Sequence, residues 1–291
     1  PEDSVKNKQD IGRALEQIYT DQSILLNELN LDNLDRFWDS FKESKLIRPS
    51  AKIEDLEKIQ EMGLKRIITH HAVQSPWFKQ RLKDQGLQPK DIMSLNSLSK
   101  LKPFTKRDIQ QAGKNFASAN VPTAYLPVGH VESSGSTGQP VSINKTAVNN
   151  LFWSAHTFRD HIWYKRDFNT KLAAIRANFN DSELRQNWGA PVAQIYKTGT
   201  GLGIPVNWGT RQQLEALEMF QPNILVLHGG VLGSLMTIWE REGCKLTELQ
   251  HIKQIGDTVH DSLRERVKTM FNITLEDNYS SSEVGTIAIQ C

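Results

Sequence analysis

The segment 132–141 carries residue types that bind phosphate. It reads Glu-Ser-Ser-Gly-Ser-Thr-Gly-Gln-Pro-Val. Its glycines, Gly135 and Gly138, let the backbone approach a ligand closely, and successive amides in such a turn can point at one anion. Serine and threonine hydroxyls stand beside them, so the segment is suited to a polyphosphate. It does not fit the Walker A spacing, and an ordinary Ser/Gly hairpin loop is an equally good interpretation of the composition alone.

A second polar segment, 277–285, follows a short apolar run and reads Asp-Asn-Tyr-Ser-Ser-Ser-Glu-Val-Gly. This order predicts a strand-to-loop turn, and such turns at the carboxyl ends of strands are where open α/β sheets bind ligands. Tyr279 offers a flat face to a base, and Ser282 offers a hydroxyl to a phosphate or carboxylate. Glu283 offers an oxygen ligand for Mg²⁺. Taken alone, the segment is also typical of a solvated polar loop.

The elements that must position these segments change in character near residue 115. In residues 1–115 apolar residues recur at helical spacing, as at Ile11, Leu15 and Ile18, which predicts a helical N-terminal region. In residues 116–291 short β-rich runs alternate with helical ones, which predicts an α/β core of mixed, largely parallel sheet flanked by helices. The expected strands are 124–128, 141–144, 172–176, 224–227, 251–255 and 273–276. The expected helices are 147–163, 211–220, 231–242 and 262–270.

Composition narrows the class of protein. The 291 residues include 35 Lys and Arg against 33 Asp and Glu, and this near balance gives no general electrostatic argument for a nucleic-acid or anionic-membrane partner. Two cysteines are too few for a disulfide-stapled scaffold, and the polar first residues do not form the apolar region of a signal peptide. We therefore expect a soluble, cytoplasmic protein.

With both segments in view, the sequence resembles the adenylate-forming (ANL) superfamily, and most closely its phenylacetate-CoA ligase-like and coenzyme F390 synthetase-like branch. The superfamily's phosphate loop, Ser-Ser-Gly-Thr-Thr-Gly-Lys-Pro, is similar to 133–140 except at Ser136 and Gln139. Its Tyr-Gly-x-Thr-Glu signature is similar to 279–283. Flanking stretches from residue 75 to 108 and from 210 to 222 also resemble that branch, so the resemblance covers about residues 70–291.

The resemblance implies an AMP-forming acid–thiol ligase. Such an enzyme activates a small carboxylic acid with ATP and Mg²⁺ as an acyl-adenylate, and then passes the acyl group to a thiol such as CoA. By this resemblance, the β- and γ-phosphates would be held by Ser133, Ser134, Gly135, Ser136, Thr137 and Gly138. Gly256 and Asp257 would lie beside the adenine, and Tyr279 would flank it. Ser282 would contact the α-phosphate and the acid, and Glu283 would bind Mg²⁺, so that Thr137, Ser282 and Glu283 form the catalytic set.

Two departures from the family pattern keep alternatives open. Gln139 stands where the family has a lysine, and the resemblance stops at Cys291, so the family's small C-terminal domain is expected to be absent and the enzyme incomplete. One alternative is an adenylation enzyme that loads a carrier protein or another acceptor. Another is a nucleotide-binding module without catalysis.

Other residues give weaker hypotheses. His228, Gly229 and Gly230 end a predicted strand and are placed to contact the acyl group. The segment 199–203, Gly-Thr-Gly-Leu-Gly, predicts a turn near the acyl pocket. Cys244, His251 and Cys291 have side chains of the types that bind Zn²⁺, although buried or idle cysteines are the simpler explanation.

Overall fold

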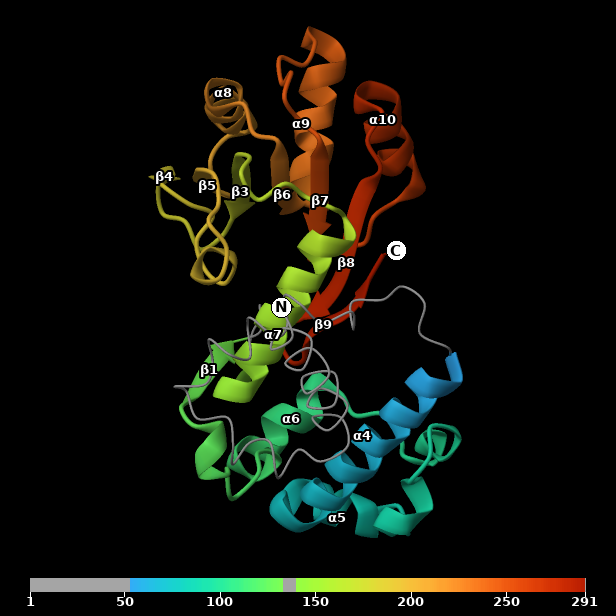
Figure 1. The fold of residues 1–291 in the computed structure, drawn as a ribbon. Coiled ribbons are helices and arrows are strands. Elements are labelled where there is room, and N and C mark those ends of the chain that lie inside the picture. The colour runs from blue at the N-terminus through green and yellow to red at the C-terminus, as the bar shows by residue number, and fades with distance from the viewer. Residues whose placement is uncertain (1–52, 133–139, 291) are drawn as a thin grey trace, which may run out of the picture. The chain divides into compact units, whose positions relative to one another are not determined.

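The computed structural model describes residues 53–132 and 140–290, which fall in two compact units, Pro1–Asn150 and Leu151–Cys291 (Figure 1). The helical spacing expected at Ile11, Leu15 and Ile18 lies outside the described residues. The functional boundary expected between residues 115 and 116 stays a prediction. We call the two parts the N-terminal unit and the C-terminal unit.

Helices dominate the first part of the N-terminal unit, as the periodicity predicts. They are α4 (Ile53–Gln74), α5 (Pro76–Asp84) and α6 (Lys106–Ala112), with short 3-10 turns at Pro89–Ile92, Asn96–Lys100, Gly113–Phe116 and Thr123–Tyr125. Ser75 starts α5 by accepting a hydrogen bond from the Phe78 amide at 3.2 Å. Helices α4 and α5 and the turn Pro89–Ile92 pack around a small core of Ile68, Leu82 and Ile92.

The antiparallel strands β1 (Val128–Glu132) and β2 (Ser142–Thr146) flank the segment for which the sequence predicts phosphate binding. Glu132 pairs with Ser142, so both ends of the intervening segment are described. The strand expected at 124–128 is wrong, because Thr123–Tyr125 forms a 3-10 turn and β1 begins only at Val128. Pro122 and Pro127 explain the shift, since a proline has no amide proton to donate to a sheet.

The C-terminal unit contains a seven-stranded sheet in the order β4-β5-β3-β6-β7-β8-β9. Its strands are β3 (Leu172–Arg176), β4 (Glu183–Arg185), β5 (Gly201–Pro205), β6 (Ile224–His228), β7 (His251–Ile255), β8 (Leu275–Ser281) and β9 (Gly285–Ile289). The five central strands are parallel, and β4 and β9 add antiparallel edges. The α/β class with a mixed, largely parallel sheet is thereby confirmed.

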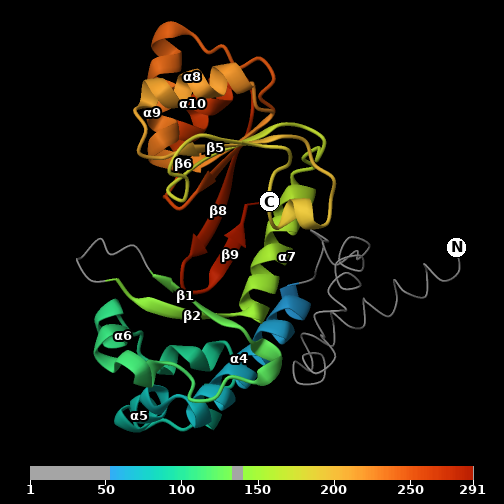
Figure 2. The same cartoon turned by 90° about the vertical axis from the view of Figure 1, so that its left-hand side faces the viewer.

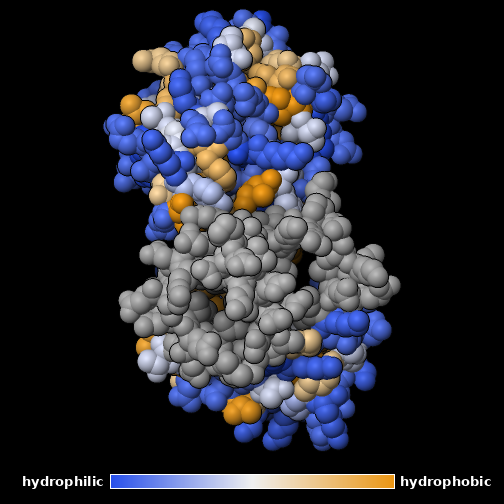
Figure 3. Space-filling view, in the orientation of Figure 1, coloured by the Kyte–Doolittle hydropathy of each residue, from blue (hydrophilic) through white to orange (hydrophobic). Residues whose placement is uncertain are grey.

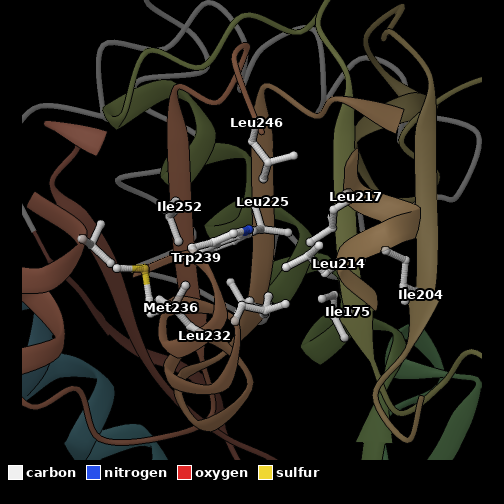
Figure 4. Packing of buried hydrophobic residues seen from close by; sticks show 14 of the residues in the cluster. Ile175, Ile204, Leu214, Leu217, Leu225, Leu232, Met236, Trp239, Leu246 and Ile252 are labelled. Atoms are coloured by element: carbon white, nitrogen blue, oxygen red, sulfur yellow. The ribbon is translucent and has the colours of Figure 1, made fainter. Parts of the chain in front are cut away.

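Three helices pack on one face of this sheet: α8 (Thr210–Phe220), α9 (Gly229–Glu242) and α10 (Asp261–Phe271). Figure 2 shows them grouped on one side of β5 and β6. Leu217 of α8 and Trp239 of α9 meet Leu225 of β6 in the hydrophobic core (Figure 4). Helices α8 and α10 end at Gln221 and Asn272, which have positive φ and stop the helical path. The charged end of α7 (Ala147–Trp163) contacts the opposite face, as described below.

The segment 199–203, predicted as a turn, instead enters β5, so that prediction is wrong. Gly201 and Gly203 are buried in this strand. A Cβ at Gly201 would lie 2.7 Å from the Asn187 carbonyl oxygen, and a Cβ at Gly203 would overlap the Phe179 ring. These glycines therefore allow neighbouring chain to pack closely on a strand.

On the face drawn in Figure 3, hydrophilic residues cover most of the described surface, with hydrophobic residues scattered among them. Such scattering is normal for protein surfaces. Among the residues that the structure describes, no helix combines the length and apolar character needed to cross a bilayer.

Candidate functional site

Two of the predicted site segments meet at the carboxyl ends of β6 and β7. His228 ends β6, and it pairs in register with Ile255, the last residue of β7. Gly256 follows with a φ of 78°, and a Cβ at this position would lie 2.7 Å from Nδ1 and Cε1 of the His228 ring. The backbone turn after β7 therefore requires glycine, both for its φ and for the room that the imidazole takes.

Asp257 ties this turn to the start of α9. Its Oδ2 accepts a hydrogen bond from the Gly230 amide at 3.2 Å and lies 3.9 Å from Nδ1 of His228. The carboxylate is well placed there, because amides at a helix N-terminus favour negative charge. Gln254 also stabilises the turn, because its Nε2 donates a hydrogen bond to the Asp257 carbonyl oxygen at 2.6 Å. The structure thus joins 228–230 and 256–257, which the sequence assigned to the acyl group and to adenine separately.

Tyr279, Ser282 and Glu283 lie on the next strand of the sheet and its turn. The expected strand-to-loop turn is a β-hairpin, because β8 continues to Ser281 and β9 returns antiparallel from Gly285. Tyr279 is 66% exposed within β8, while Ser282 and Glu283 are exposed in the connecting turn. Because β8 runs parallel to β7 and their last pair is Ile255 with Asn278, the predicted residues Tyr279, Ser282 and Glu283 all come after the end of this pairing, in the part of β8 that extends beyond β7 and in its turn.

Several predicted site residues lie outside the described part of the chain. They are Ser133, Ser134, Gly135, Ser136, Thr137, Gly138 and Cys291. Their assigned contacts with phosphate and with zinc stay predictions.

The zinc hypothesis gains no support from the residues that the structure describes. Within them, no three His, Cys, Asp or Glu side chains are grouped so that they could hold a metal. The Cys244 sulfur accepts a hydrogen bond from the Leu246 amide at 3.4 Å, and burial raises the pKa of the Cys244 thiol. A raised pKa opposes the thiolate form that binds zinc. His251 directs Nδ1 to Oε1 of Glu276 at 2.7 Å.

A buried network of charged residues lies on the sheet face that α7 contacts, and the sequence analysis missed it. Asp160 of α7 accepts hydrogen bonds on Oδ2 from Nη1 of Arg166 at 2.6 Å and from Nζ of Lys253 at 2.6 Å. Arg166 also pairs with Glu276 of β8, to which His251 is bonded. Two cations thus face two carboxylates, and α7 is joined to the strands that carry 256–257 and 279–283.

Electrostatics within this network follow from burial and pairing. Burial alone would raise the pKa of the Asp160 carboxyl, but Lys253 and Arg166 lower it overall. The pKa of His161 lies well below its usual value, because burial and the neighbouring Arg166 both disfavour its charged form. Burial, with help from Glu276 and Asp160, raises the pKa of Tyr164 to about 12. The sequence did carry one signal of this network: Lys253 and Glu276 are charged residues inside segments that were predicted as strands of the core.

No protein-family model matches the chain. Among curated proteins, the phenylacetate-coenzyme A ligase of Pseudomonas putida is 25% identical over 266 residues, covering 83% of this chain and 55% of that protein. The Escherichia coli K12 protein of the same name is 24% identical over 262 residues, with the same coverage. The chain therefore spans about half the length of the curated relatives it matches.

Solved structures agree on the fold. An open conformation of 2-hydroxyisobutyryl-CoA ligase, in complex with 2-HIB-AMP and CoA, superposes with a TM-score of 0.59 and 14% identity, covering 80% of this chain and 55% of that one. The same ligase in the postadenylation state gives a TM-score of 0.60 and covers 81% of this chain and 50% of that one. At 14% sequence identity, these superpositions show a similar fold and do not show a shared function.

Proposed function

Because the chain is a distant member of the adenylate-forming superfamily, on its phenylacetate-coenzyme A ligase-like branch, we propose that it takes part in AMP-forming ligation of a carboxylic acid to a thiol. A single observation supports this most strongly. The segments 228–230 and 256–257 lie at the carboxyl ends of the adjacent strands β6 and β7, and 279–283 comprises the last residues of the neighbouring strand β8 and the turn after it. That edge is where open α/β sheets bind ligands.

In this proposal the turn after β7 and the exposed ring of Tyr279 flank the adenine. The ring presents a flat apolar face, and the backbone at Gly256 has no side chain to keep a base away. His228 lies against Gly256 and borders the acyl group, while Asp257 keeps the two turns together through the Gly230 amide. Ser282 contributes a hydroxyl to the α-phosphate and the attacking carboxylate.

Glu283 fits the role of a magnesium ligand by its chemistry and exposure. Its carboxylate is an oxygen donor on an exposed turn, and Mg²⁺ in nucleotide sites is commonly held by one or two carboxylates together with substrate phosphates. When bound, Mg²⁺ would neutralise charge on the phosphate oxygens. The residues of this chain would then orient the carboxylate for in-line attack on the α-phosphorus and release of pyrophosphate.

The acceptor in the proposed second step is CoA, and the enzyme works in the cytoplasm.

The test is ATP–pyrophosphate exchange by the full-length natural polypeptide with a panel of carboxylic acids, followed by release of AMP on addition of CoA. Exchange that CoA does not convert to AMP release would assign the acyl group to a carrier protein or another acceptor. Bound ATP with no exchange for any acid would contradict ligase chemistry.

A nucleotide-binding module without catalysis is the second candidate, and Gln139 favours it. A glutamine at this position removes a positive charge that the related phosphate loops carry. Calorimetry with ATP separates the two functions, since such a module binds nucleotide and forms no acyl-adenylate.

A further inference from the structure

Arg176, the last residue of β3, is a cation without an anion. Its Nε is buried and makes no hydrogen bond. Within the described part of the chain, no carboxylate lies within ion-pair distance of its guanidinium. The charged neighbour that it does have repels it: burial lowers the pKa of Lys253, and the charges of Arg166 and Arg176 lower it further.

In the buried network next to Arg176, both carboxylates are already paired with other cations. Its cations, Lys253 and Arg166, are matched by the carboxylates of Asp160 and Glu276. An arginine stays protonated in proteins, and Arg176 is half-buried with its Nε inaccessible to solvent, so its charge is incompletely solvated and no described carboxylate compensates it. A half-buried charge that the described residues leave unpaired indicates a ligand of opposite charge.

The position of Arg176 in the sheet agrees with a ligand site. The parallel strands run in the order β5-β3-β6-β7-β8, so the chain crosses from β3 to β5 on one side and continues to β6 on the other. Arg176 therefore ends the strand at the point where the strand order reverses, the usual binding position in such sheets. Ala173 and Ile175 of β3 face the hydrophobic core, so alternation directs Arg176 to the opposite face.

A second unpartnered polar atom lies on the same face. Glu276 of β8 bonds to Arg166 on this side of the sheet, and Asn278, two residues later, shares its face. Oδ1 of Asn278 is buried and has no hydrogen-bond donor among the described residues. The face thus offers a guanidinium fork and a carboxamide oxygen, both without protein partners, near the carboxyl ends of the strands.

We propose that Arg176 anchors an oxyanion-binding subsite at the carboxyl end of β3. A planar guanidinium binds a carboxylate or a phosphate through two parallel hydrogen bonds, and both ligands supply the missing negative charge. The oxyanion comes either from a carboxylic acid substrate or from a phosphate group of a nucleotide. The subsite does not depend on the proposed ligase reaction, because it is defined by binding.

The experiment compares the wild-type chain with Arg176→Met and Arg176→Lys in buffer free of polyvalent anions. Arg241→Met serves as the control, since Arg241 is an exposed arginine of the same unit. The probes are inorganic phosphate and succinate, and the readouts are the Tm and the calorimetric Kd. Without probe, we expect Arg176→Met to unfold at the same temperature as wild type or higher, because the substitution removes a half-buried charge that has no described partner.

With probe, we expect the Tm of wild type and Arg241→Met to rise. The Kd should be roughly 10- to 100-fold weaker in Arg176→Met, from the loss of charge-assisted hydrogen bonds. The Kd of Arg176→Lys should lie between those of wild type and Arg176→Met, since lysine keeps the positive charge but cannot make the two parallel hydrogen bonds of a guanidinium. Binding of phosphate alone assigns the subsite to a nucleotide phosphate, and binding of succinate alone assigns it to a substrate carboxylate. Absence of binding by both probes, or equal Kd values in wild type and Arg176→Met, would overturn the proposal.

Discussion

The imidazole of His228 occupies the space where a side chain at Gly256 would begin. A Cβ at position 256 would lie 2.7 Å from two atoms of the ring, and the backbone φ of 78° independently favours glycine. Two residues 28 positions apart in the sequence therefore constrain each other at the edge of the sheet. This contact fixes the turn that the proposed nucleotide site uses.

Replacement of Gly256 by alanine should lower the free energy of unfolding by about 1–3 kcal/mol, through overlap with His228 and backbone strain. Urea denaturation measures the change. Adding His228→Ala should recover the part due to overlap and leave the part due to φ. Gly233→Ala is the matched control: Gly233 lies inside α9 with nothing within 4 Å of its Cβ position, so alanine should stabilise by about 0.5–1 kcal/mol. Equal effects of the two single substitutions would contradict the constraint.

Arg166→Met should cost about 3–5 kcal/mol of stability, because it leaves two buried carboxylates with too few partners. The side chains of Arg166 and Asp160 are 0% and 1% exposed, and their further pairs with Glu276 and Lys253 join the end of α7 to the sheet. Arg266→Met provides the comparison, since Arg266 forms a partly exposed pair with Glu240 at 2.7 Å. That substitution should cost about 0–1 kcal/mol. A similar loss in both variants, measured by urea denaturation, would show that burial of the Arg166 network does not matter.

The stability of the C-terminal unit should fall as the pH drops below 6.5. The pKa of His161 in the folded state lies well below the usual 6.5, because burial and Arg166 disfavour its protonated form. Below pH 6.5 the side chain of His161 binds a proton in the unfolded chain but stays neutral in the folded chain. Acid therefore favours unfolding. Each such group contributes a slope of up to about 1.4 kcal/mol per pH unit. In unfolding measurements between pH 7 and 5, His161→Phe should show a smaller slope than wild type; an unchanged slope would exclude His161 as a source.

Glu283→Gln should reduce ATP–pyrophosphate exchange by roughly 100-fold or more, because a magnesium ligand stabilises charge worth several kcal/mol in the transition state. The loss should be accompanied by a higher Mg²⁺ requirement. Glu265→Gln removes an equal charge from the exposed surface of α10 and should leave exchange unchanged. If both variants keep wild-type exchange and the same Mg²⁺ dependence, Glu283 does not bind the metal.

The sequence predicted several elements with their correct bounds. The expected segments 147–163, 172–176 and 251–255 coincide with α7, β3 and β7. In α7 apolar residues recur at helical spacing, and β3 is a short, mostly apolar run, so local propensity and burial agree in these two elements. The prediction missed β5 because its glycines suggest a turn, whereas packing against Asn187 and Phe179 makes glycine necessary in a strand. It missed β4 and β9 because short edge strands depend on pairing with a neighbour.

Within the candidate site, local motifs were visible in the sequence and their neighbours were not. The segments 228–230 and 256–257 could each be picked out by their glycines, but only the parallel pairing of β6 with β7 shows that they touch. The ion pair of Asp160 with Lys253 spans 93 residues, and that of Arg166 with Glu276 spans 110. Pairing over such separations depends on topology, which no local pattern encodes.

The four charged residues at 160, 166, 253 and 276 also have a consequence for how the sequence can diverge. Loss of any one leaves an uncompensated charge in the interior, whereas replacement of the whole set by apolar residues of similar volume avoids that cost. A substitution at only one of these four positions should therefore be selected against. Across natural homologues, the four sites are expected to covary, retained together or exchanged together, as one inherited block.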